Sequence, residues 1–256
     1  MGKYILSATF CARANLKIQL KGYLNQMHYV WFIWSLLFLM VWIILYLSKP
    51  SFRKEMMSIS LGTMLFGFTE PLFVPAYWNP PSLFDLAQRT GFDIESFIFT
   101  FAIAGTSSVL YRVIYRRNVT KMDASEMMHS RHRLHIYFLS SPIPIFLALA
   151  IFTKLNHIYC GVIAMFAGAL LTLYCRPDLR WKIWIGGLLF LVYYFVFFLS
   201  LLSFFPSYVI HVWNLKALTG ILLLGIPLEE LLFAFSFGML WSSLYEHISW
   251  YKITNS

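Results

Sequence analysis

The amino-acid sequence predicts an all-α integral membrane protein with about seven transmembrane helices, arranged as two parallel three-helix repeats that a connector helix joins. Three observations lead to this fold class. Hydrophobic residues make up 59% of the 256 residues and charged residues 12%, whereas roughly 25% of an average soluble domain is charged. The apolar residues fall into runs of about 20, the length of a helix that crosses a bilayer. Two of these runs also begin with related sequences.

Seven apolar runs define the predicted spans, and short polar linkers separate them. The expected spans are residues 27–47, 56–74, 92–115, 136–153, 157–175, 181–205 and 226–248. From their order we divide the chain into an N-terminal tail, a first repeat of three spans, a connector with one span and a second repeat of three spans. These four parts cover residues 1–26, 27–130, 131–155 and 156–256.

The net charge of +9 indicates membrane orientation rather than nucleic-acid binding, because the basic residues lie in short linkers between apolar runs. The linkers after the first, third and fifth spans are basic, so we expect them and the C-terminus to face the cytoplasm. The tail conflicts with this orientation because it is basic too; it would be a surface amphipathic piece or an extension before a start near Met27. We predict a multi-pass protein of the cell membrane that contacts membrane lipids and no nucleic acid. The sequence does not determine the oligomeric state.

The third and seventh spans begin with related sequences. Residues 91–96 align with residues 225–230 at an offset of 134 positions, and the match continues through Phe99 and Phe233 without a gap. Upstream, Trp78-Asn79 matches Trp213-Asn214 at an offset of 135. This self-similarity predicts a duplicated three-helix unit.

Carboxylates mark the candidate site. Glu229 and Glu230 stand side by side at the start of the seventh span, and Glu95 has the corresponding place in the third span. Glu70 lies fourteen residues into the second span, which is roughly 21 Å along a helix, so all four acids are expected in the outer half of the bilayer. Ionisable groups at such a depth are costly and therefore indicate function.

A helix terminus offers a competing explanation for two of these acids. Pro227 suits the first position of a helix, and Glu229 and Glu230 would favour its positive end by about 0.3–1 kcal/mol. Glu70 differs, because it is expected late in its helix, just before Pro71, where a negative charge is unfavourable. Capping therefore does not explain Glu70.

Histidines give a weaker signal. His129, His132 and His135 recur at every third position, but Arg131 and Arg133 lie among them, so we expect a solvated or headgroup-facing strip rather than a metal site. The chain also lacks the glycine-rich and lysine motifs that bind nucleotides. We therefore expect no metal and no cofactor.

The segment Pro227-Leu228-Glu229-Glu230, with Tyr245-Glu246 further on, resembles the Pro-x-Glu-Glu motif of the lycopene cyclase domain family. These are small membrane cyclases that occur as paired subunits in some bacteria and as fused double domains in archaea and fungi, and the two-repeat plan resembles the fused form. The first copy departs from the motif, because Asp93-Ile94-Glu95-Ser96 lacks the proline and the second acid. Either one half catalyses or the activity has drifted.

The resemblance implies an enzyme of the intramolecular lyase or isomerase type that acts on a lipophilic polyene, lycopene or a related carotene. An acid protonates the terminal double bond, the cation closes onto the neighbouring double bond, and a base removes a proton to leave a β-ring without net redox change. We expect Glu230 to be the proton donor, Glu229 its coupled partner, and Glu70 or Glu95 the base or second acid.

Aromatic faces stabilise a passing cation. The expected substrate-binding residues are Phe99, Pro227, Phe233, Phe237 and Trp241. Two other functions stay open. The same superfamily contains carotenoid hydratases, and a parallel three-helix repeat also suits a transporter or a non-enzymatic carotenoid-binding protein.

Overall fold

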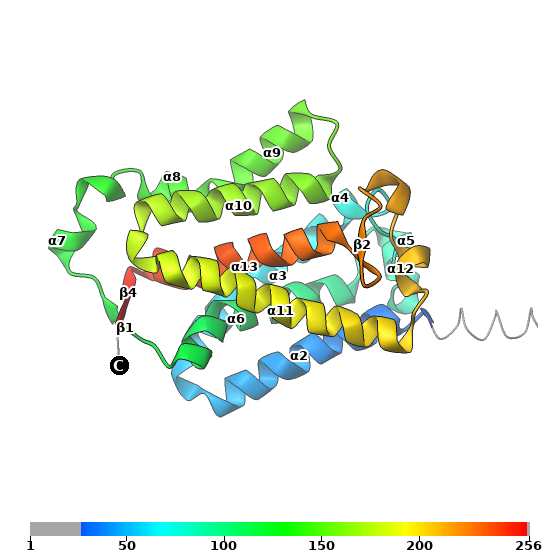
Figure 1. The fold of residues 1–256 in the computed structure, drawn as a ribbon, viewed down its shortest axis with the longest axis horizontal. Helices are drawn as coiled ribbons and strands as arrows, with labels where there is room; N and C mark the ends of the chain where they lie inside the picture. Colours follow the sequence, from blue (N-terminus) through cyan, green and yellow to red (C-terminus); the bar gives the residue numbers. More distant parts are fainter. Residues whose placement is uncertain (1–26, 255–256) are drawn as a thin grey trace, which may run out of the picture.

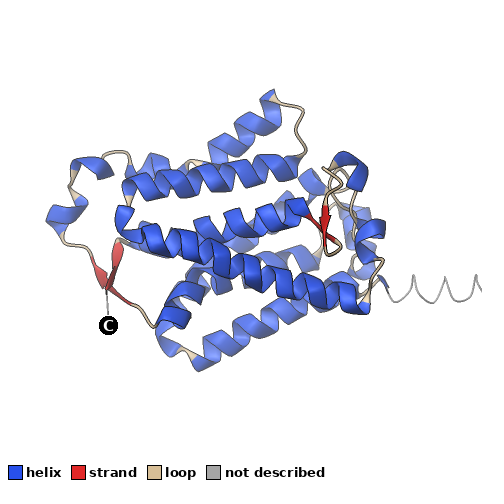
Figure 2. Cartoon of the chain, viewed as in Figure 1, coloured by secondary structure: helices blue, strands red, loops and turns tan. Residues whose placement is uncertain are grey.

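The computed structural model describes residues 27–254, and these residues form a mostly helical molecule whose long helices run along its longest axis (Figures 1 and 2). The expected tail, residues 1–26, lies outside the described residues. The α-helices are α2 (Val30–Ser48), α3 (Arg53–Met64), α4 (Glu70–Phe73), α5 (Leu86–Thr90), α6 (Ile94–Tyr115), α7 (Ala124–Met127), α8 (His135–Ser140), α9 (Pro142–Phe152), α10 (His157–Cys175), α11 (Arg180–Phe204), α12 (Tyr208–Val212) and α13 (Leu228–Ser249).

Short 3-10 helices and strands connect these helices. The 3-10 helices are η1 (Pro50–Phe52), η2 (Leu65–Thr69), η3 (Leu83–Asp85), η4 (Ser130–His132), η5 (Pro177–Leu179) and η6 (Leu215–Ala217). The strands form two antiparallel pairs, β1 (Asn118–Lys121) with β4 (Tyr251–Thr254) and β2 (Leu222–Leu223) with β3 (Ile226–Pro227). The all-α prediction missed these strands, because pieces of two to four residues are too short to carry an alternating pattern.

Within residues 27–254, four helices are long and apolar enough to cross a membrane: α2, α6, α10, and α11 together with η5. This is what a membrane protein requires. The other three expected spans correspond to α3 with η2 and α4, to α8 with α9, and to α13, whose sequence holds three glutamates. The arrangement of seven spans in two repeats stays a prediction.

Two of the expected spans are broken. In the second span the helix tightens to η2 after Met64 and begins again as α4, so Glu70 lies in the first turn of α4, beside Pro71. The sequence-based placement of Glu70 at the end of a continuous helix was therefore wrong. Gly67 lies at this break, where an added Cβ would come within 2.7 Å of the Phe97 ring. The fourth span is interrupted before Pro142, the first residue of α9.

Several elements of the two halves of the chain resemble each other. Helices α2 and α10 have 19 residues each, and α6 and α13 have 22 each. Gly91 before α6 and Gly225 before α13 both have positive φ, of +80° and +85°, which a glycine adopts without steric cost. Arg116 and Trp250 end α6 and α13 in the same left-handed conformation. These correspondences support the two-repeat arrangement.

Equivalent residues of the two halves also pair with each other. Trp78 and Trp213 form an antiparallel bridge, in which the Asn79 amide donates to the Val212 carbonyl at 2.8 Å and the Asn214 amide donates to the Tyr77 carbonyl at 2.9 Å. Beyond the far ends of α6 and α13, strands β1 and β4 pair around their equivalent residues in the same symmetric way. Such pairing is what a two-fold relation between the halves produces.

Four buried charged residues join the halves at the β1–β4 end. Arg112 of α6 lies 2.5 Å from Glu55 of α3, and Lys182 of α11 lies 2.5 Å from Glu246 of α13. Across the halves, Arg112 is 3.7 Å from Glu246 and Lys182 is 3.8 Å from Glu55. Two pairs of these residues occupy equivalent positions in the two halves. Glu55 and Lys182 each lie three residues after a 3-10 helix that begins with proline, and Arg112 and Glu246 are separated by the offset of 134 positions. Equivalent positions therefore carry opposite charges.

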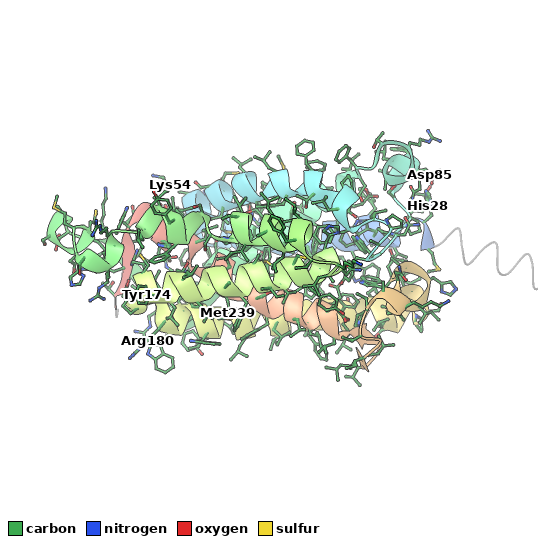
Figure 3. The ribbon with its side chains drawn as sticks, turned by 90° about the horizontal axis from the view of Figure 1, so that it is seen from above. His28, Lys54, Asp85, Tyr174, Arg180 and Met239 are labelled. Carbon is green, nitrogen blue, oxygen red and sulfur yellow. The ribbon has the colours of Figure 1, made fainter. Side chains whose placement is uncertain are left out.

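Figure 3 labels two basic residues at this end of the molecule. Lys54 and Arg180 lie there, whereas Asp85 and His28 lie at the opposite end, 4.0 Å from each other. The orientation relative to the cytoplasm stays a prediction.

The substitution Lys182→Met should destabilise the fold by about 3–5 kcal/mol, because it leaves a buried carboxylate without its nearest counter-charge. The measurement is the thermal unfolding midpoint of detergent-solubilised protein. The double variant Lys182→Met/Glu246→Leu keeps the buried charges balanced and should recover most of the loss. The control Lys54→Met removes an exposed lysine of α3 and should change stability by less than about 0.5 kcal/mol. A Lys182→Met protein that unfolds like the wild type would contradict this account.

Candidate active site

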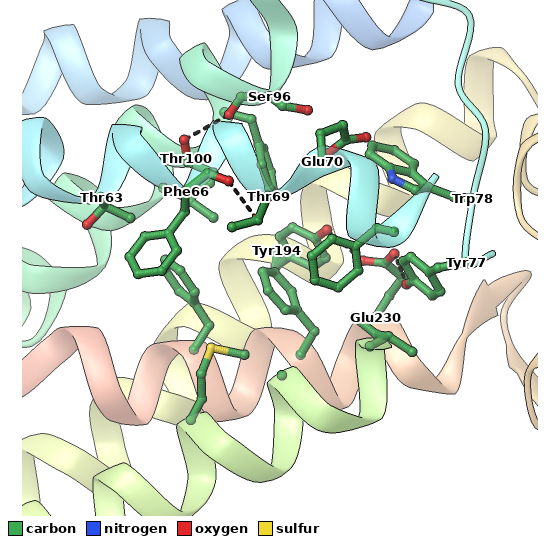
Figure 4. Close-up of a pocket in the computed structure, with 18 of the residues that line it drawn as sticks. Thr63, Phe66, Thr69, Glu70, Tyr77, Trp78, Ser96, Thr100, Tyr194 and Glu230 are labelled. Atoms are coloured by element: carbon green, nitrogen blue, oxygen red, sulfur yellow. Dashed lines mark hydrogen bonds between the residues drawn. The ribbon is translucent and has the colours of Figure 1, made fainter. Parts of the chain in front are cut away.

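A cavity of about 420 Å³ lies between the two halves, at the end with Trp78 and Trp213 (Figure 4). Residues from α2, η2, α4, α6, α9, α10, α11 and α13 line it, and most of this lining is aromatic or aliphatic. Its volume is in the range of small-molecule sites, about 300–1,000 Å³. Two carboxylates, Glu70 and Glu230, belong to the lining.

The cavity reaches the side of the molecule. Phe66 of η2 and Leu72 of α4 line it and are 44% and 41% exposed, and Ile143 and Leu147 of α9 line it and are 57% and 50% exposed. Helix α9 buries none of its residues. The mouth therefore lies between α9 and the η2–α4 segment, and apolar side chains surround it.

Glu230 is held by three hydrogen bonds. The Tyr77 hydroxyl and the Trp213 indole donate to Oε1, the latter at 2.8 Å, and the Tyr194 hydroxyl donates to Oε2 at 2.7 Å. Burial and the negative charge of Glu230 raise the pKa of Tyr77 well above its usual value, so this hydroxyl keeps its proton. Tyr77 comes from the first half of the chain and the other two donors from the second, so both halves build the environment of Glu230.

Glu70 has a different environment. Its side chain is buried, its Oε1 has no hydrogen-bond partner, and the acidic residues Asp93 and Glu95 lie nearby. Ser96, which occupies the position equivalent to Glu230, is a neighbour of Glu70 and also lines the cavity. The first copy of the motif has Ser96 in place of a second acid, and Glu70 from a different helix places a carboxyl group beside this position.

The structure brings Glu70 and Glu230 to the cavity but does not bring Glu95 and Glu229 there. Glu229 Oε1 accepts hydrogen bonds from the Tyr159 hydroxyl at 2.6 Å and from the Thr219 amide at 2.8 Å. Glu95 Oε1 accepts one from the Leu83 amide at 2.6 Å. The two equivalent acids therefore anchor the loop that precedes their helix, and adjacent glutamates of α13 face different surroundings.

The aromatic wall follows the helical spacing of α13. Phe99, Phe233, Phe237 and Trp241 all line the cavity as expected, whereas Pro227 caps α13 and does not. The rings of Phe237 and Trp241 stack with centroids 4.4 Å apart. The Trp241 indole donates to Thr63 Oγ1 of α3 at 2.8 Å, which fixes its orientation.

Several lining residues escaped the sequence analysis. The repeated Trp-Asn pair pointed to Trp78 and Trp213, but their role in the site was not inferred. Tyr77 has no counterpart in the second half, where Val212 takes its place, and Tyr194 lies inside an apolar run without any distinguishing pattern. Lining residues that the sequence analysis did not single out also include Trp31, Trp34, Phe38, Phe66, Phe73, Phe146, Phe197, Phe198 and Tyr208.

The histidines depart from the expected solvated strip. His129 is exposed as expected, but His132 is buried and His135 is half-buried, both next to Cys175 at the end of α10. His132 and His135 are covered because the chain folds back and packs η4 and α8 against α10. The local sequence does not reveal this contact. Burial, helped by the charges of His132 and Arg176, lowers the pKa of His135 to about 4, so its ring is neutral at physiological pH.

Fold and site together define a helical membrane protein with an apolar, carboxylate-bearing cavity that opens sideways. A family model described as Lycopene cyclase matches residues 156–248, which run from the residue before α10 almost to the end of α13. The resemblance expected from the acidic motif is thereby confirmed, and the match supports a lycopene cyclase-type function. No curated protein and no solved structure matches the chain.

The loop-anchoring acids give a stability prediction. Glu229→Gln keeps an acceptor oxygen for Tyr159 and Thr219, so the loss should stay near 1 kcal/mol, whereas Glu229→Leu leaves both donors unpaired and should cost about 2–4 kcal/mol. Limited proteolysis between Pro206 and Gly225 measures the effect directly, because a released loop is cut faster. Glu95→Gln and Glu95→Leu should show the same ranking in the loop of residues 76–90. Equal protection in the Gln and Leu variants would show that these acids do not hold the loops.

Proposed function

We propose that this protein is a membrane lycopene cyclase, which closes linear carotene ends to β-rings by acid catalysis without net redox change. One observation carries the proposal. Glu70 and Glu230 face the same aromatic cavity in a chain whose second half matches the lycopene cyclase family. The proposed substrate is a lipophilic polyene, and the apolar mouth beside α9 lets such a molecule enter from the bilayer.

The size of the cavity favours one end of the substrate at a time. A volume of about 420 Å³ accommodates a ring-sized group with part of its chain, and the remainder of a long polyene would extend through the mouth. Few polar groups line this space, so a polar solute would bind poorly there. The lining therefore favours an enzyme for an apolar substrate over a transporter of polar ones.

The two carboxylates have different proposed roles. Glu70 has hydrogen-bonding neighbours in Ser96 and Trp78, but its Oε1 has no donor and the acidic residues Asp93 and Glu95 lie nearby. Glu70 is thus the better proton donor. Glu230 receives three donated hydrogen bonds, which stabilise a carboxylate and offset part of the cost of its burial, so we assign Glu230 as the base for the final deprotonation. This reverses the roles inferred from the sequence.

The proton balance is closed. One proton passes from Glu70 to the terminal double bond, the resulting cation takes the electron pair of the neighbouring double bond to form the ring bond, and Glu230 removes one proton. Phe233, Phe237 and Trp241 stabilise the cation between these steps through their ring faces. Solvent exchange then returns both acids to their starting states.

The direct test is expression in lycopene-accumulating cells. We expect conversion to carotenes with one or two β-rings, measured by pigment chromatography. Membranes incubated with lycopene in deuterated water, without added nicotinamide or flavin, should place one deuterium in each ring, measured by mass spectrometry. Unchanged lycopene with folded protein would refute the proposal, and hydroxylated carotenes would identify a hydratase instead.

Adjacent glutamates of α13 provide a matched pair of variants. Glu230→Gln and Glu70→Gln should each lower turnover by roughly a hundredfold or more, the usual scale for general acid and base catalysis. Glu229→Gln changes the neighbouring residue in the same way but outside the cavity, and should keep activity within about tenfold of the wild type. Initial rates are measured with equal amounts of folded protein. Full turnover by Glu230→Gln, or equal losses in Glu229→Gln and Glu230→Gln, would overturn the site assignment.

A further inference from the structure

A second cluster of functional side chains lies at the opposite end of the molecule from the cavity. His132 ends η4, His135 begins α8, and Cys175 is the last residue of α10. The His132 Nδ1 atom is 3.4 Å from Cys175 Sγ, and the His135 Nδ1 atom is 3.6 Å from it. The three atoms that could bind a metal all lie within 4.8 Å of one another.

The two nitrogen-to-sulfur spacings match those of a metal-bound set. A tetrahedral zinc ion with Zn–S of about 2.3 Å and Zn–N of about 2.0–2.1 Å places its sulfur and nitrogen ligands roughly 3.5–3.6 Å apart. The two measured nitrogen-to-sulfur distances, 3.4 and 3.6 Å, bracket this value. Imidazole nitrogen with thiolate sulfur is also the ligand chemistry that zinc uses.

The surroundings supply a further donor and a rigid frame. His247 of α13 is fully buried, its Nε2 has no hydrogen-bond partner, and its ring centroid lies 4.4 Å from that of His135. The His135 ring stacks on Trp250 with centroids 3.9 Å apart. Nearby, Arg176 is paired with Asp178 at 2.7 Å, so its charge is balanced. The His247 ring, with a buried Nε2 that has no partner and with His135 beside it, is the candidate for a fourth ligand.

We propose that His132, His135 and Cys175 form a binding site for a divalent metal ion that prefers nitrogen and sulfur ligands, namely Zn²⁺. The role is structural. The ion would tie the start of the connector segment to the end of α10, and through His247 to the end of α13. The site is independent of the proposed cyclase reaction, because it lies at the other end of the helices from Glu70 and Glu230.

The test measures zinc in the full-length protein, purified in detergent with an affinity tag that contains no histidine. Mass spectrometry of the metal content should find one zinc per chain in the wild type. Cys175→Ser and His132→Gln should lose most of it. The control Cys160→Ser removes the other described cysteine, which is equally buried but lies near the opposite end of α10, and should retain the zinc. His129→Gln, an exposed histidine of the same series, should also retain it.

A spectroscopic measurement on the wild-type protein tests the proposal even if the variants fail to fold. Replacing zinc by Co²⁺ in the wild-type protein should produce the thiolate-to-cobalt charge-transfer absorption of a cysteine-bound ion, and this band should persist in Cys160→Ser. A wild-type protein without zinc and without this band would refute the proposal. Equal zinc contents in Cys160→Ser and a folded Cys175→Ser would refute it as well. Neither result bears on the cyclase assay, so the two proposals fail separately.

Discussion

The buried network of Glu55, Arg112, Lys182 and Glu246 is the constraint on which the arrangement of the helices depends. Removing a charge from water is costly unless a counter-charge lies beside it, so each of these four residues requires its partners. Two contacts join helices within a half and two join the halves. Because equivalent positions carry opposite charges, the first half fits the second better than it would fit a copy of itself. The network thus specifies which surfaces of α3, α6, α11 and α13 meet.

Because α6 and α13 are long, their positions at the charged network also determine where their opposite ends lie. The 22 residues of α13 connect Glu246 with Glu230, and the 22 residues of α6 connect Arg112 with the region of Ser96. With both helices fixed, Tyr77 of the first half reaches Glu230 of the second, and the Trp78–Trp213 bridge closes the wall between them. The result is one shared cavity to which the two segments contribute differently, since residues 225–230 offer Glu230 and residues 91–96 offer Ser96 with Glu70 beside it.

Sequence patterns predicted the parts that depend on local chemistry. The expected aromatic wall of Phe233, Phe237 and Trp241, with Phe99 from the related segment, lines the cavity, because residues four apart on a helix lie on the same side whatever surrounds it. The expectation that Glu229 and Glu230 act as coupled partners at one site does not match the structure, in which only Glu230 lines the cavity. They are neighbours in sequence, but successive residues of a helix point about 100° apart, so one reaches the cavity while the other reaches a loop. The prediction that the histidines form a solvated strip was wrong for a related reason. The burial of His132 and His135 depends on contacts with α10, about 40 residues away in the sequence.

The sequence by itself determined that the chain is helical and apolar, that two of its segments are similar, and that α13 carries the acidic motif of the lycopene cyclase family. These properties follow from the composition, from the periodicity and from the repetition of short segments. Only the tertiary structure decided which acids share a cavity, which donors surround Glu230, and that Cys175 meets two histidines. Those features require residues from helices far apart in the chain, and their contacts arise from the packing of one helix face against another, which no local pattern encodes.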